Sequence, residues 1–149
     1  MANRLGIRHC ADGLLAAGNP VGTDAFVTAH ANAGAESICA GIDALEDGLL
    51  SAQDKFIILR MSAQMRLAHL PRIAPWHLIG AAIQRVEDRT AAAAFAIMDR
   101  PVDPVLRKGQ LVLPLRLGGM GIRLTTESEA RAAYLSAAAM TGSSTPRRC

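Results

Sequence analysis

The stretch from Pro75 to Asp99 limits what this chain can fold into more than any other part of the sequence. Its apolar and small residues recur at steps of three or four, which places them on one face of an α-helix: Trp76, Ile79, Ile83, Val86, Thr90, Ala93 and Ile97. Polar residues, among them Arg85 and Arg89, occupy the opposite face, and Pro75 suits the first helical turn. A helix of roughly 35 Å needs neighbours that cover its apolar stripe. The pattern therefore predicts a helical domain, and it names no chemistry.

The composition agrees with a helical core of small side chains. The chain has 149 residues, the length of one ordinary domain. Half of the residues are hydrophobic but only 3% are aromatic, so the core must be built from aliphatic side chains and alanine. The net charge is +3, and all but two of the sixteen basic residues are arginines. Because the guanidinium group suits phosphates and carboxylates, this charge permits contact with nucleic acid without requiring it.

Two further helices are expected before Pro75. Thr23 is a suitable N-cap for a helix that begins at about Asp24, with a possible kink at Gly34. Ser51 is the next N-cap, and the helix that follows extends to His69. Apolar residues surround more than half of this second helix, so we expect it to be buried on two sides and to pack against the 75–99 helix. The short links predict antiparallel neighbours.

The two ends of the chain carry turn signals. Residues 5–22 read as a β-hairpin that turns at Asp12-Gly13. Residues 111–117 are expected to be extended, and the glycines of residues 118–121 to form a tight turn, since the motif lacks the Lys-Ser/Thr of a phosphate-binding loop. Thr125 or Thr126 should cap a last helix, with Glu127 and Glu129 in its first turn.

The expected fold is mainly α, an antiparallel bundle of about four helices with a short N-terminal β-hairpin. Residues 1–22 form the hairpin segment, residues 23–140 the helical domain, and residues 141–149 a disordered tail. No signal peptide is recognisable, and the longest apolar run, residues 91–98, is far shorter than the roughly 20 residues of a membrane span. We therefore expect a soluble, intracellular protein without a membrane partner.

No catalytic or metal-binding pattern stands out. The three cysteines and four histidines follow no ligand spacing, and the acidic pairs resemble solvated helix faces. A hydrolytic triad could be drawn from Ser62, His69 and Asp54, but no nucleophile motif supports it. The expectation is a chain with no catalytic residues, no metal and no cofactor.

Three segments together resemble a known family. Residues 13–22, GLLAAGNPVG, resemble the L-G-x-P-I-G hairpin of reverse transcriptases from non-LTR (LINE-type) retrotransposons. Residues 66–72, RLAHLPR, resemble the R-x-x-x-L-x-R stretch of the thumb-like helices in that family. Residues 113–123, LPLRLGGMGIR, resemble the L-P-x-R-x-G-G-L-G-L segment that follows the thumb, and this match is the most specific. The resemblance covers about residues 5–140.

The resemblance implies a region that lies after the catalytic palm. The polymerase motif of the family contains adjacent aspartates, which this chain lacks, and it would lie before Met1. The chain would then be a fragment derived from an RNA-directed DNA polymerase, unable to polymerise DNA by itself. Its implied partner is the backbone of an RNA or DNA duplex, with five candidate contacts: Arg60, Arg66, Arg72, Arg85 and Arg89. The alternative is a helical protein-interaction module or an inactive retroelement remnant.

Overall fold

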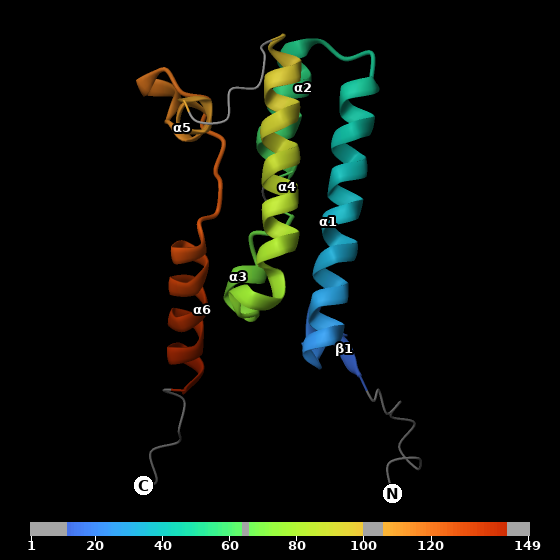
Figure 1. Cartoon of the computed structure of the whole chain (residues 1–149), viewed down its shortest axis with the longest axis vertical. Coiled ribbons are helices and arrows are strands. Elements are labelled where there is room, and N and C mark those ends of the chain that lie inside the picture. Colours follow the sequence, from blue (N-terminus) through green and yellow to red (C-terminus); the bar gives the residue numbers. More distant parts are fainter. Residues whose placement is uncertain (1–11, 64–65, 100–105, 143–149) are drawn as a thin grey trace, which may run out of the picture.

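The computed structural model describes residues 12–63, 66–99 and 106–142, and within them it is mainly helical with an N-terminal hairpin (Figure 1). The hairpin consists of β1 (Gly13–Ala16) and β2 (Asn19–Gly22). The helices are α1 (Asp24–Asp47), α2 (Ala52–Ile58), α3 (Leu70–Ile73), α4 (Trp76–Ile97), α5 (Leu106–Val112) and α6 (Glu127–Gly142). A π-helical turn, Leu59–Ala63, continues α2, and a 3-10 turn, Leu115–Leu117, follows α5. The predicted fold class is confirmed.

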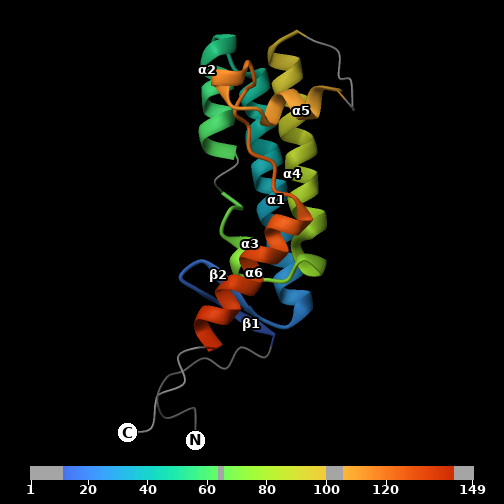
Figure 2. The same cartoon turned by 90° about the vertical axis from the view of Figure 1, so that its left-hand side faces the viewer.

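The centre of the molecule is the contact between α1 and α4. The two helices lie side by side and run in the same direction, while α2 and α6 run the opposite way (Figures 1 and 2). Most of the predicted stripe of α4 is buried, from Ile79 to Ala93, and Pro75 is the N-cap residue rather than part of the first turn. Helix α4 does contact α2 and its π-helical turn, as predicted, but its main partner is α1, which was not predicted.

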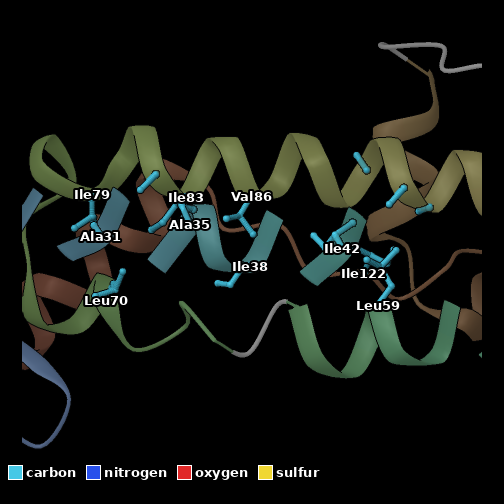
Figure 3. Close-up of a cluster of buried hydrophobic side chains, with 14 of the residues drawn as sticks. Ala31, Ala35, Ile38, Ile42, Leu59, Leu70, Ile79, Ile83, Val86 and Ile122 are labelled. Carbon is cyan, nitrogen blue, oxygen red and sulfur yellow. The ribbon is translucent and has the colours of Figure 1, made fainter. Parts of the chain in front are cut away.

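Small side chains allow the two long helices to approach closely. Ala31 and Ala35 of α1 and Ala93 and Ala94 of α4 are 0–1% exposed. In Figure 3, Ala31 and Ala35 lie opposite Ile79 and Ile83, and Leu59 and Leu70 close the cluster from other elements. This arrangement is the alanine-rich aliphatic core that the composition predicts.

The first long helix begins where the sequence places it. The Thr23 hydroxyl accepts a hydrogen bond from the Phe26 amide at 3.3 Å, which satisfies one of the free N–H groups at the helix start. The helix then continues to Asp47 without a break at Gly34, where an added Cβ would lie 3.5 Å from the Leu67 side chain. The possible kink is therefore not present.

The second helix is much shorter than predicted. The Ser51 hydroxyl accepts from the Asp54 amide at 3.2 Å, so the predicted cap is confirmed, but α2 ends at Ile58. Helical backbone continues only through the π-helical turn to Ala63, and Pro71, which has no N–H to donate, lies in the first turn of α3. Burial on two sides is also wrong: Leu59 is 1% exposed, whereas Ile57, Ile58 and Met61 are 42–66% exposed.

The hairpin turns at a different place from the one predicted. Its two-residue turn is Ala17-Gly18, with φ of 51° and 82°, and Gly13 pairs with Gly22 at the other end of the strands. Positive φ at both central residues matches the right-handed twist of the strands. Gly13 serves close packing, because an added Cβ would lie 2.5 Å from the Phe26 ring. Residues 5–11 of the predicted hairpin lie outside the described residues.

The segment after α4 also differs from the prediction. Residues 106–117 form α5 and the 3-10 turn rather than an extended run. A lone extended segment would leave its backbone groups unpaired, whereas here Ile122 N–H donates to Leu111 C=O at 2.9 Å and Gly121 N–H to Leu113 C=O at 2.9 Å. The predicted glycine turn is confirmed, with φ of 76° at Gly118 and 64° at Gly121.

Helix α6 follows the glycine turn, and it begins with a capping box. The Glu129 amide donates to the Thr126 hydroxyl at 3.3 Å, and the Glu129 carboxylate accepts from the Thr126 amide at 2.9 Å. The hydrogen bonds that this carboxylate accepts from the Thr126 amide and from the Thr126 hydroxyl lower the pKa of Glu129. The helix ends at Gly142, so it includes the first two residues of the predicted tail, and residues 143–149 lie outside the described residues.

Candidate nucleic-acid interface

The five predicted arginines lie on separate parts of the bundle. Arg60 is half-buried on the π-helical turn, where its guanidinium lies against Gly121. Arg66 and Arg72 are exposed on either side of the start of α3. Arg85 and Arg89 belong to α4. They therefore do not form one continuous basic face.

Arg89 joins the two long helices. Its Nε donates to an Asp43 carboxylate oxygen at 2.6 Å, its Nη1 donates to Glu46 at 3.2 Å, and its Nη2 forms ion pairs with both carboxylates. Hydrogen bonding to Glu46 is the main reason why the pKa of Arg89 lies above its usual range, with a smaller contribution from Asp43 and an opposing one from burial. A phosphate could reach this guanidinium only by displacing the carboxylates, so Arg89 is the weakest of the five candidates.

Arg85 lies near the same contact but is exposed. The charges of Arg85 and Arg89 lower the pKa of the Cys39 thiol on α1, although burial and Asp43 raise it more and the net shift is upward. Arg85 precedes Arg89 by four residues, about one turn of α4, so the two side chains lie on the same side of this helix. The Arg85 side chain is exposed, and within the described residues none of the ion pairs found involves it, so a ligand could bind Arg85 without breaking one.

The crevice beside the hairpin turn has a basic lining. It has a volume of about 200 Å³ and is lined by Gly18, His30, Gly34, Ser37, Ile38, Arg66, Leu67, His69 and Leu70. The polar side chains in it are those of Arg66, His30, His69 and Ser37, and none of the lining residues that the structure describes is acidic. Imidazole and hydroxyl groups donate hydrogen bonds to phosphate oxygens as guanidinium does, so this crevice suits a backbone phosphate.

Sequence reasoning missed His30 and His69 as members of this group. Thirty-eight residues separate them in the chain, and no spacing rule connects them. The link between them is tertiary, since α1 carries His30 and the turn before α3 carries His69. The signal in the sequence was the position of His69 within the segment that resembles the thumb.

A larger cavity of about 740 Å³ lies between α2, the end of α4 and the 3-10 turn. Among the described residues its lining is mostly apolar, with Gln53 and Gln110 as polar members and none that is charged: Ala52, Gln53, Phe56, Phe95, Ile97, Met98, Gln110, Leu115, Gly119 and Met120. This lining does not suit a phosphate.

The carboxylates have structural roles. Asp43 and Glu46 hold Arg89, and Glu87 of α4 accepts a hydrogen bond from the Thr125 amide, which fixes the approach to α6. Among the described residues, no group of three histidine, cysteine or carboxylate side chains is placed to hold a metal ion. Nor does any helix in the described ranges have the length and apolar character to cross a membrane.

Comparison with known proteins gives no relative. No protein-family model matches the chain, and neither a curated protein nor a solved structure is significantly similar to it.

Proposed function

We propose that this chain is a thumb-like, non-catalytic region derived from a reverse transcriptase, and that it binds the backbone of a nucleic-acid duplex. The basic crevice beside the hairpin turn carries the proposal. Arg66 and two histidines line it, and it adjoins Gly18 in the hairpin that resembles the family's primer-holding motif.

Exposed arginines extend this surface. Arg66 and Arg72 lie six residues apart around α3, and both are exposed. Contacts to phosphates are electrostatic and independent of sequence, so binding would require neither a base-reading element nor a metal. Arg85 and the half-buried Arg60 are secondary contacts, and Arg89 contributes by keeping α4 in place.

Binding should depend steeply on salt. Each phosphate neutralised on a DNA duplex contributes a slope of about −0.9 to the plot of log K against log salt concentration. Contacts from Arg66, Arg72 and one further arginine would give a slope of about −3. Fluorescence anisotropy with a labelled DNA duplex and an RNA–DNA hybrid, at salt concentrations from about 50 to about 200 mM, measures this slope.

Charge reversal tests the residues. The double variant R66E/R72E should lower duplex affinity at least about tenfold at low salt and flatten the slope by about 2. R131E is the control for the single reversals R66E and R72E, because each of these three variants changes one exposed arginine to glutamate, and Arg131, which is 66% exposed and pairs with Glu127, lies on α6. Absence of binding at low salt, or affinities of R66E and R72E equal to that of R131E, would contradict the proposal.

A further inference from the structure

A ridge of exposed apolar side chains runs from the residue before the N-cap of α2 into the π-helical turn that continues this helix. Leu50, Ile57, Ile58 and Met61 are 48%, 49%, 42% and 66% exposed, although all are large and hydrophobic. Figure 2 shows α2 at the lateral edge of the molecule. Single exposed leucines are ordinary on a protein surface, but four large apolar side chains exposed within twelve residues of one segment favour an interaction site.

A groove runs alongside this ridge. It has a volume of about 310 Å³ and lies between α1 and the segment formed by α2 and its π-helical turn. Ile38, Ile42 and Leu59, all buried, belong to its lining, and the ridge residues Leu50 and Ile58 are part of it too. Two copies of such a face can pack against each other about a twofold axis. The ridge of each molecule then enters the groove of the other molecule.

Charge makes the face self-complementary. Asp54 lies in the first turn of α2, and Arg66, twelve residues further along the chain, lines the groove. In an antiparallel pair related by a twofold axis near residue 60, Asp54 of each copy would face Arg66 of the other. Within each chain, Asp54 bonds with Ser51 at 2.6 Å, and Arg66 has no ion pair recorded within the described ranges.

We propose that the ridge Leu50, Ile57, Ile58 and Met61, together with the groove beside it, is a homodimer interface in which two copies pack α2 against α2 in antiparallel orientation. Burial of the ridge supplies the attraction, and the Asp54–Arg66 pairs fix the direction of the two helices. This interface is independent of duplex binding except at Arg66, which lies between the groove and the basic crevice.

Sedimentation velocity of the full chain without nucleic acid tests the proposal. From about 1 to about 200 µM, the wild-type chain should pass from monomer to dimer. M61E should raise the dimer dissociation constant at least about tenfold, whereas L135E, on α6, should leave it unchanged. Leu135 is a matched control because its exposed fraction, 66%, equals that of Met61.

A charge swap tests the antiparallel arrangement. D54R and R66D should each weaken the dimer, and the double variant D54R/R66D should regain most of the affinity, since the attraction is restored with its sign exchanged. Far-UV circular dichroism checks that each variant keeps its helical content. A wild-type chain that stays monomeric over the whole range overturns the proposal without any variant. So does a double variant that is folded but no tighter than the single ones.

The two proposals fail in different measurements. D54R should weaken self-association and, at protein concentrations at which the wild-type chain is monomeric, should not lower duplex affinity, because Asp54 lines neither the basic crevice nor the region around α3. R72E should do the reverse. A chain that dimerises but does not bind a duplex would refute the proposed function and leave the interface standing.

Discussion

At the scale of single residues, Arg89 changes role between sequence and structure. On the helical pattern it belongs to the polar face of α4, where a ligand could reach it. In the fold its guanidinium bridges Asp43 and Glu46 on α1, with 27% of the side chain exposed. Bidentate contact between guanidinium and carboxylate is specific in geometry and stronger than a neutral hydrogen bond. The residue therefore fixes the register of the two long helices.

Replacement of Arg89 by methionine should destabilise the fold. The change keeps an apolar stem but leaves two carboxylates without their partner, at a cost of about 1–2 kcal/mol in the free energy of unfolding. Urea denaturation followed by circular dichroism measures it. R131M removes an exposed pair within α6 and should cost less than about 0.5 kcal/mol. Equal losses in the two variants would show that the bridge adds nothing beyond a surface pair.

At the scale of elements, close approach of α1 and α4 depends on their alanines. Ala35 is completely buried in the middle of α1, and Figure 3 places it opposite Ile83. Interiors are packed to near-crystalline density, so the space that a larger side chain needs is not available there. The low aromatic content and the high alanine content of the chain therefore have one explanation: small side chains let α1 and α4 pack closely.

Replacement of Ala35 by leucine should separate the two helices. Three additional carbons at a fully packed position cost about 1–3 kcal/mol through displaced side chains and backbone. A40L is the control, because Ala40 is exposed on the same helix and leucine is nearly as good a helix former as alanine. Thermal melts of the two variants compare these costs. A melting temperature of A35L equal to that of A40L would mean that the α1–α4 contact is loose.

At the scale of the whole molecule, stability should be graded from the α1–α4 centre outwards. Ten residues of α4 are buried, whereas along α6 the described core residue is Ala130, and Leu135 and Met140 are 66% and 77% exposed. Opening free energies follow the amount of buried apolar contact. The last helix should therefore open before the centre unfolds.

Hydrogen exchange measured by mass spectrometry tests this gradient. Amides of α4 should exchange only by global unfolding and should be the slowest in the chain, while those of α6 should exchange at least about tenfold faster. A peptide from α1 serves as the internal reference, because α1 shares the core with α4. Protection of α6 equal to that of α4 would show that α6 is held by contacts stronger than its burial indicates.

Local chemistry in the sequence was enough to locate several elements. Thr23, Ser51 and Thr126 begin helices because their side-chain oxygens satisfy nearby backbone N–H groups, which needs no distant partner. The apolar stripe of α4 is also recognisable from the sequence, because a period of three to four residues is a property of the helix itself and needs no distant partner. The glycine turn at residues 118–121 belongs here too, because positive φ is a local requirement.

The tertiary structure alone decided which surfaces meet. The apolar residues of α2 predict burial on two sides, yet the described neighbours cover only one side, and a pattern of side chains cannot show how many neighbours a helix has. The ion pairs of Arg89 span 43 and 46 residues, and the crevice joins the hairpin turn, α1 and the start of α3. Periodicity and capping act over one or two turns of chain, so the sequence by itself determined where helices start and which face is apolar. Packing between distant segments depends on every segment that takes part in it, so only the tertiary structure shows which arginines are exposed to a ligand and which stabilise the fold through ion pairs.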